Sequence, residues 1–379
     1  MKKISILGST GSIGKTTLDV IRQNPNLYEV IALSANTNIL EIEKQAREFN
    51  PKIIAIFDEK KAKELRKKIP NIKIVSGLDG LIEIVSLDEV DFVMSSICGF
   101  IGLIPTIHAI KKNKTIGLAN KEVMVSAGDF VNSLLDKHSA KLIPVDSEHN
   151  AIFQCLKNEK TKDVKRIILT ASGGPFFNYS IEKLSKITLN DALNHPTYKM
   201  GKKISVDSST LMNKGLEIIE AYHLFKLDID QIDVVIHPQS IIHSFVEFID
   251  GSILAQMSKP NMYIPISYSL SYPNRIKSNI EKFDFIKNDK LSFFQPDLEK
   301  FKCLRLAIDA IKEKKSYPCF LNAANEVLVE KFLNKKISYL DISNKLEQLI
   351  TFHKTKDMLS LDDILEVDKQ ARDLANKLC

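Results

Sequence analysis

The chain has 379 residues, with 53 Lys and Arg against 47 Asp and Glu, which gives a net charge of +6. This length excludes a single compact core, so we expect two or three domains. The basic excess is small and scattered along the sequence, which disfavours a nucleic-acid or membrane surface as a partner. The five cysteines are far apart and form no C-x-x-C pair, as in proteins with reduced thiols.

The N-terminal residues predict a strand, a glycine turn and a helix. Residues 3–7 (KISIL) are typical of a short buried strand, Gly8, Gly11 and Gly14 follow, and residues 15–22 place apolar side chains at helical spacing. Glycines at this spacing permit a tight turn, close approach to a phosphate and close helix packing, while the helix N-terminus favours an anion. The pattern favours a dinucleotide pyrophosphate, and a plain structural turn is the alternative.

A nucleoside triphosphatase is a second interpretation of this segment. Gly14, Lys15 and Thr16 are similar to the end of a phosphate-binding loop, but that motif requires glycine at position 9, where the chain has Ser9. The spacing therefore fails by one residue.

The second expected strand, residues 28–33, bears on the choice of cofactor. Asn36, Thr37 and Asn38 follow it, without the acidic residue that binds a ribose hydroxyl in NAD sites. Uncharged polar groups at this place favour NADPH. Short apolar runs at residues 52–57, 73–75 and 91–95 alternate with helical segments, and the first 145 residues therefore predict a doubly wound parallel sheet.

Two carboxylates come directly after the strand-like run at residues 141–145. Asp146 and Glu148 stand one residue apart, and in an extended chain such side chains point to the same side. Oxygen ligands of this kind suit Mg²⁺ or Mn²⁺. The pair therefore indicates a metal site, with a solvated acidic loop as the alternative.

A third carboxylate is offered further along the chain. Glu217 lies one turn after Asn213 and Lys214 on an expected helix, so the three side chains share one face. Glu220 competes with Glu217 as the third ligand.

The central residues predict a second sheet. The strand at residues 166–170 leads into Ser172, Gly173 and Gly174, a combination that suits an anion cradle. Further strands are expected at residues 234–237, 241–248 and 252–257, with a hairpin turn at Asp250 and Gly251. We interpret His237 and His243, on these strands, as core histidines.

From residue 301 the pattern becomes helical and predicts a small helical bundle. No apolar run approaches the ~20 residues of a membrane helix, and the first expected strand begins at residue 3. We therefore expect a cytoplasmic protein without a targeting segment or a membrane partner.

Seven segments spread over nearly the whole chain carry a family resemblance: residues 8–14, 118–122, 144–154, 171–176, 195–217, 237–247 and 321–326. Among their sequences are GSTGSIG, LANKE, PVDSEHNAIFQ, ASGGPF, HPQSIIHSFVE and LNAANE. On these motifs the chain resembles the 1-deoxy-D-xylulose 5-phosphate reductoisomerase family of the non-mevalonate isoprenoid pathway.

The resemblance implies an α/β fold in three parts. These are a Rossmann-like NADPH-binding domain at residues 1–145, a catalytic and homodimer-forming domain with an open sheet at 146–275, and, after a linker at 276–300, a helical domain at 301–379. The implied reaction rearranges and reduces 1-deoxy-D-xylulose 5-phosphate to 2-C-methyl-D-erythritol 4-phosphate. A divalent metal ion would act as Lewis acid, and NADPH would deliver hydride.

The resemblance also implies site residues. The metal ligands would be Asp146, Glu148 and Glu217, with Lys121 and His195 as further catalytic residues. The substrate would contact Ser172, Ser208, Asn213 and Lys214 at its phosphate and Lys121, Ser147, Glu148, His195 and Glu217 along its sugar chain. The cofactor would contact Thr10, Gly11, Ser12, Ile13, Asn36, Thr37, Asn38, Asn120, Glu122 and Gly201.

Residues 195–203 combine a proline and a glycine with the apolar side chains of Tyr198 and Met200, which is typical of a lid that excludes water from a reaction. A surface loop is the alternative. Tyr198 replaces the indole usual in the family, Lys199 follows it, and Val123 replaces a serine. A non-catalytic NADPH sensor is a further alternative for the whole chain, although a sensor needs no set of three carboxylates.

Overall fold

The computed structural model describes residues 1–194 and 200–378. The chain divides into two compact units: unit 1 comprises Met1–Val123, Val131–Asn150 and Asn261–Asn279, and unit 2 comprises Met124–Phe130, Ala151–Pro260 and Ile280–Cys379. The three-part division expected from the sequence, with its linker at residues 276–300, stays a prediction.

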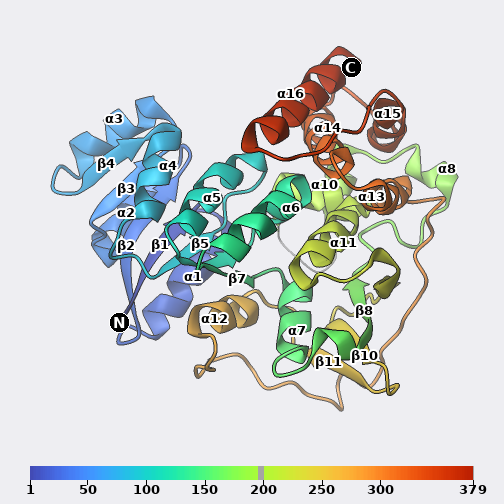
Figure 1. Cartoon of the computed structure of the whole chain (residues 1–379), viewed down its shortest axis with the longest axis horizontal. Helices are drawn as coiled ribbons and strands as arrows, with labels where there is room; N and C mark the ends of the chain where they lie inside the picture. The colour runs from blue at the N-terminus through green and yellow to red at the C-terminus, as the bar shows by residue number, and fades with distance from the viewer. Residues whose placement is uncertain (195–199, 379) are drawn as a thin grey trace. The chain divides into compact units, whose positions relative to one another are not determined.

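Unit 1 is built on a seven-stranded parallel sheet with the order β4-β3-β2-β1-β5-β6-β7 (Figure 1). The strands are β1 (Lys2–Leu7), β2 (Tyr28–Ala35), β3 (Ile53–Ile56), β4 (Lys73–Ser76), β5 (Phe92–Ser95), β6 (Thr115–Leu118) and β7 (Lys141–Pro144). Their inner residues are buried on both faces, as in sheets that helices cover on both sides. The strand order reverses between β1 and β5, so the expected doubly wound sheet is confirmed.

Helices connect and cover these strands. They are α1 (Ser12–Gln23), α2 (Ile39–Phe49), α3 (Glu59–Lys68), α4 (Gly77–Ser86), α5 (Leu103–Lys111) and α12 (Tyr263–Ser271), with α6 (Lys121–Lys137) kinked at Ala127, η1 (Phe100–Gly102) before α5, and α7 (Ser147–Cys155) after β7. Right-handed crossovers place α1 to α3 on one face and α4 and α5 on the other. In agreement, α1 packs against α12, whereas α4 packs against α5.

The strand β6 and the helix α12 were not expected from the sequence. β6 has only four residues, one of them Gly117, which weakens its strand pattern. A Cβ atom at Gly117 would lie 2.7 Å from the ring of Phe92 and 2.8 Å from the hydroxyl of Ser269 on α12. The glycine thus permits close packing of α12 on the sheet, a tertiary reason that local propensity does not reveal.

Unit 2 contains a four-stranded mixed sheet with the order β11-β10-β8-β9. The strands are β8 (Val164–Ala171), β9 (Ile232–Ile236), β10 (Ile242–Phe248) and β11 (Ile253–Met257). β8 pairs in parallel with β9, and β10 is antiparallel to both β8 and β11. The expected hairpin turn at Asp250 and Gly251 joins β10 to β11.

Unit 2 also contains helices. They are α8 (Ile181–Leu184), α9 (Leu189–Leu193), α10 (Lys202–Ser209), α11 (Met212–Phe225), α13 (Lys302–Glu313), α14 (Tyr317–Leu333), α15 (Tyr339–Thr351) and α16 (Leu361–Leu378), with the short turns η2 (Thr161–Asp163) and η3 (Ile229–Gln231). α10 and α11 pack beside the bundle α13 to α16, drawn in orange to red in Figure 1. The expected C-terminal helical bundle is confirmed. Among the described residues, every helix is too short or too polar to cross a membrane.

Candidate active site

The glycine turn between β1 and α1 is shaped by close backbone contacts. Gly8 has φ +78°, and a Cβ atom there would lie 2.8 Å from the carbonyl oxygen of Ser96. A Cβ atom at Gly14 would lie 2.4 Å from the carbonyl oxygen of Gly8, so glycine is required at both positions. Gly11 and Ser12 are exposed at the N-terminus of α1. Open backbone N–H groups at a helix N-terminus fit the pyrophosphate of a dinucleotide.

The residues after β2 have two different roles. Asn36 and Thr37 are exposed beyond the end of the strand, where a cofactor ribose can reach them. The side chain of Asn38 instead accepts a hydrogen bond from the backbone N–H of Glu41 at 3.2 Å and caps α2. Its assignment to cofactor binding therefore competes with a structural role.

Asn120, Lys121 and Glu122 follow β6 and are all buried. The Asn120 side-chain amide donates to the carbonyl oxygens of Ile97, and of Gly99 at 2.8 Å, which fixes the loop after β5. Lys121 forms an ion pair with Asp146, which follows β7. Because carboxyl ends of parallel strands share one edge, this edge of the sheet carries Asn120 and Lys121 together with the glycine turn and Asn36.

Asp146 and Glu148 do not form the extended pair that the sequence predicted. Asp146 lies in a bend and its carbonyl oxygen accepts from the N–H of Asn150 at 2.8 Å, while Ser147 and Glu148 begin α7. The alternation of side chains in a strand therefore does not apply to them. The hydroxyl of Ser147 donates to Glu148 at 2.6 Å. Both carboxylates stand at a helix N-terminus, whose positive dipole end stabilises negative charge.

In unit 2, a glycine turn follows β8 and brings two predicted phosphate ligands together. Gly173 and Gly174 have φ +84° and +65°, and the N–H of Gly174 donates to the Ser172 hydroxyl at 3.2 Å. A Cβ atom at Gly174 would lie 2.7 Å from the carbonyl oxygen of Ser208, so the turn packs directly on the end of α10. Ser172 also lines a cleft of about 810 Å³ with Phe177, a volume suited to a small organic ligand.

The first turns of α11 carry three polar residues on one face, as the sequence predicted. Lys214 and Glu217 are buried and form an ion pair, and the Asn213 side-chain amide donates to the second carboxylate oxygen of Glu217 at 2.6 Å. The Lys214 ammonium group, the Glu217 carboxylate and the Asn213 amide are thus held in contact next to the end of α10. This donor set suits a phosphate and a hard cation.

Several predicted residues of the lid lie outside the described residues: His195, Tyr198 and Lys199. Gly201 is exposed and is the N-cap residue of α10, and a Cβ atom there would meet no other described residue within 4 Å. Lys202 and Lys203, expected in the same loop, belong to the first turn of α10.

His237, directly after β9, and His243, on β10, are core residues, as expected. His237 is fully buried, stacks on Phe293 with ring centroids 4.8 Å apart, and accepts the N–H of Ile241 on its Nε2 at 3.2 Å. His243 bonds the hydroxyl of Ser258 at 2.9 Å.

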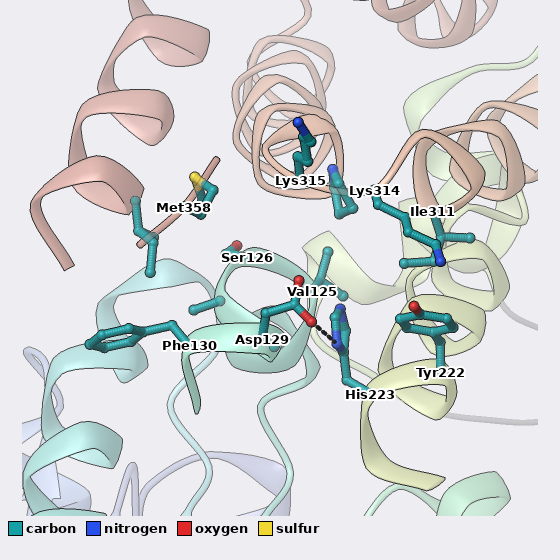
Figure 2. A pocket seen from close by; sticks show the side chains of 14 residues that line it. Val125, Ser126, Asp129, Phe130, Tyr222, His223, Ile311, Lys314, Lys315 and Met358 are labelled. Atoms are coloured by element: carbon teal, nitrogen blue, oxygen red, sulfur yellow. Dashed lines mark ion pairs between the residues drawn. The ribbon is translucent and has the colours of Figure 1, made fainter. Parts of the chain in front are cut away.

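Sequence reasoning missed a pocket between α6 and α11 that contains charged groups. Figure 2 shows Asp129 pointing toward His223, with Oδ1 and Nδ1 3.5 Å apart. The hydrogen bond to His223 lowers the pKa of Asp129, against the opposing effect of burial. The pocket has about 30 Å³, room for a few water molecules at most. It is therefore too small for a sugar phosphate, and nothing in the spacing of α6 residues signalled it.

Three family models match the chain. They are described as 1-deoxy-D-xylulose 5-phosphate reductoisomerase (residues 4–128), its C-terminal domain (142–225) and DXP reductoisomerase C-terminal domain (257–374). A 1-deoxy-D-xylulose 5-phosphate reductoisomerase of Protochlamydia amoebophila is 52% identical over 99% of this chain and 98% of its own length. That of Chloroherpeton thalassium is 50% identical over 98% and 97%.

Solved structures show the same likeness. The reductoisomerase from Zymomonas mobilis in complex with NADPH matches with a TM-score of 0.93 and 42% identity, over 100% of this chain and 98% of that one. A DOX-P reductoisomerase in complex with NADPH, fosmidomycin and magnesium matches with the same TM-score, identity and coverage.

Proposed function

The chain belongs to the 1-deoxy-D-xylulose 5-phosphate reductoisomerase family, and we propose that it converts 1-deoxy-D-xylulose 5-phosphate to 2-C-methyl-D-erythritol 4-phosphate with NADPH and a divalent cation. The observation that carries the proposal is the contact of the Ser172–Gly174 turn with Ser208, beside the polar face of α11. This arrangement supplies hydroxyl, amide and ammonium donors for a phosphate and a carboxylate for a cation.

The substrate phosphate is bound, in this proposal, by Ser172, Ser208, Asn213 and Lys214. Lys214 is buried, so its charge acts on the phosphate with little screening by solvent. Asn213 adds N–H donors from the same helical turn. These groups hold the phosphate end and thereby fix the position of the reacting carbons.

The cation is bound by Asp146, Glu148 and Glu217, whose oxygens suit Mg²⁺ or Mn²⁺. When bound, the cation supplies Lewis-acid polarisation of the substrate oxygens, and NADPH supplies the hydride. Lys121 orients Asp146 through their ion pair. We assign contacts with the sugar chain to Lys121 and Ser147, and also to His195 on the basis of its sequence motif.

NADPH is bound by the edge of the unit 1 sheet. The glycine turn from Thr10 to Ile13 receives the pyrophosphate, and the exposed Asn36 and Thr37 receive the ribose phosphate. Asn38 supports this contact as the cap of α2. Asn120, Glu122 and Gly201 complete the assigned cofactor-binding residues.

We further propose a cytoplasmic homodimer. The exposed surface of unit 2 includes apolar side chains at the hairpin that ends the sheet: Ile249, Ile253 and Leu254 are 68%, 52% and 44% exposed. β11 is an edge strand, and an apolar edge of this kind is favourably covered by another chain. A second copy of this chain is the partner proposed, and light scattering of the purified protein tests it directly.

A direct assay tests the proposed reaction. Purified protein, substrate, NADPH and Mg²⁺ or Mn²⁺ are mixed, and the nicotinamide absorbance is followed over time. Substrate-dependent oxidation that a chelator abolishes supports the proposal. NADPH binding without turnover under either metal would support the sensor alternative, and ATP hydrolysis in its place would support a triphosphatase.

A further inference from the structure

The end of α10, where Ser208 lies, is held by two buried side chains from the C-terminal helices. Asn325 of α14 donates its side-chain N–H to Asp207 Oδ1 at 2.9 Å, and both residues are buried. Tyr339, at the start of α15, donates its hydroxyl to the carbonyl oxygen of Ser209 at 2.7 Å. The residues on both sides of Ser208 are therefore anchored to the helical bundle.

Both oxygens of the Asp207 carboxylate have a partner. Its Oδ2 forms an ion pair with Lys203, one turn earlier on α10, at 2.8 Å. Two charge-assisted bonds hold the buried carboxylate in one orientation. Because Asp207 directly precedes Ser208, this fixes the backbone that carries the serine.

The corner between α10 and α11 has a strained backbone. Leu211 has φ +59°, a left-handed conformation that a branched side chain adopts only when surrounding contacts impose it. On α11 a Cβ atom at Gly215 would lie 2.4 Å from the Cβ of Ala307 on α13, so that helix also packs closely on the bundle. The corner from Ser208 to Lys214 is thus constrained at both of its ends.

We propose that Asn325 and Tyr339 are positioning residues that set Ser208 for the substrate phosphate, acting through Asp207 and Ser209. The inference rests on the proposed function, since it takes Ser208 as a phosphate ligand. In this proposal neither Asn325 nor Tyr339 contacts the substrate or the cofactor. Their effect is on the geometry of the phosphate site and is selective for the phosphorylated substrate.

The test compares kcat/KM for 1-deoxy-D-xylulose 5-phosphate with kcat/KM for unphosphorylated 1-deoxy-D-xylulose. Asn325→Asp places a second carboxylate beside Asp207, and we expect KM for the phosphorylated substrate to rise about tenfold or more. The ratio of the two kcat/KM values falls by the same factor. The double variant Asp207→Asn/Asn325→Asp restores one N–H donor and one carboxylate, and it recovers most of the ratio.

Tyr339→Phe is the milder variant, in case Asn325→Asp does not fold. It removes only the hydroxyl, and we expect the ratio to fall about threefold to tenfold, the usual effect of one lost hydrogen bond. Tyr263→Phe is the matched control, because its hydroxyl donates to Gln23 at 2.9 Å within unit 1 and should leave the ratio unchanged.

Failure of this inference and failure of the proposed function give different results. If Asn325→Asp and Tyr339→Phe lower both kcat/KM values equally, or only lower the melting temperature, the residues are structural and the inference is wrong. If the unmodified protein does not turn over the phosphorylated substrate, the proposed function fails instead.

Discussion

Lys214 and Glu217 form a buried ion pair within one turn of α11. In the proposed reaction the lysine binds the substrate phosphate and the glutamate binds the cation. Each charge therefore compensates the other within the helix, and removal of one would take a counter-charge from the other in a buried environment. The two ligand sites are thereby linked through a single pair of side chains.

Glu217→Gln should weaken metal binding while leaving the hydrogen bond from Asn213 possible. The amide removes the negative charge, and we expect Mn²⁺ affinity to fall by about a hundredfold or more, with activity lost accordingly. Titration of Mn²⁺ followed by electron paramagnetic resonance of the free ion measures the affinity. NADPH affinity should be unchanged.

Glu220→Gln is the matched comparison, because Glu220 is buried on the same helix. We expect it to retain the Mn²⁺ affinity of the unmodified protein. The reverse pattern, with normal binding in Glu217→Gln and lost binding in Glu220→Gln, would make Glu220 the third ligand.

Gly128→Ala should destabilise unit 2. A Cβ atom at Gly128 would lie 2.2 Å from the ring of His223, which is held by Asp129 in the pocket of Figure 2. Overpacking of this kind costs about 1–3 kcal/mol of unfolding free energy. Urea unfolding measures the loss.

Gly201→Ala serves as the control for the unfolding measurement only, since a Cβ atom there meets no residue in the part of the chain that the structure describes. If Gly128→Ala and the unmodified protein have equal unfolding free energies, the prediction is wrong. Helices α6 and α11 can then move apart to accommodate the added methyl group without loss of stability.

The strand, turn and helix at the N-terminus could be predicted because their determinants are local. Gly14 is required by its contact with Gly8 within the turn, Gly8 has a positive φ, and Ile4, Ile6 and Leu7 of the first strand are apolar and buried. The shared face of Asn213, Lys214 and Glu217 follows from helical spacing alone. These parts of the candidate site were therefore predictable from residue type and spacing.

Other parts depend on contacts that are distant in sequence. The conformation of Asp146 and Glu148 was predicted wrongly because β7 ends at Pro144 and α7 begins at Ser147, so the extended chain does not continue through the two carboxylates. The anchoring of Asp207 by Asn325 joins residues 118 positions apart. Spacing within one segment carries no information about such a pair.

Asn36→Asp should shift the cofactor preference from NADPH toward NADH. Asn36 is exposed after β2, and a carboxylate there would repel the 2′-phosphate and accept a hydrogen bond from a free ribose hydroxyl. We expect the ratio of kcat/KM for NADPH to that for NADH to fall at least about tenfold, equivalent to ~1.4 kcal/mol.

Asn38→Ala provides the contrast, because its side chain caps α2. It should lower stability by about 1 kcal/mol with little change in the ratio. If Asn36→Asp leaves the ratio unaltered, this turn does not discriminate between the cofactors.

His353 should make stability depend on pH. Its ring stacks on Phe320 with centroids 4.3 Å apart and its Nε2 bonds the Ser316 hydroxyl at 2.9 Å. Burial, with a smaller effect of Lys356, lowers the pKa of His353 below its ordinary value. The unfolded chain therefore binds the proton more readily than the folded one. The contribution of neutral His353 to the free energy of unfolding is fully present above the ordinary histidine pKa and is lost as pH falls through the lowered value.

His353→Phe removes the titrating group and keeps an aromatic ring against Phe320. Between pH ~7 and ~5, around the ordinary histidine pKa, the unfolding free energy of this variant should decline less than that of the unmodified protein. Parallel pH profiles for the two proteins would contradict the assignment.

The most direct test of the proposed reaction follows the hydride itself. NADPH carrying deuterium at the transferred position is incubated with 1-deoxy-D-xylulose 5-phosphate, Mg²⁺ and the protein, and the product is analysed by mass spectrometry and NMR. We predict 2-C-methyl-D-erythritol 4-phosphate with the deuterium on the carbon of the new hydroxymethyl group, which is the carbon of the aldehyde that NADPH reduces. A reduced product with an unrearranged carbon skeleton, or a rearranged product without deuterium, would contradict the coupling of isomerisation to reduction.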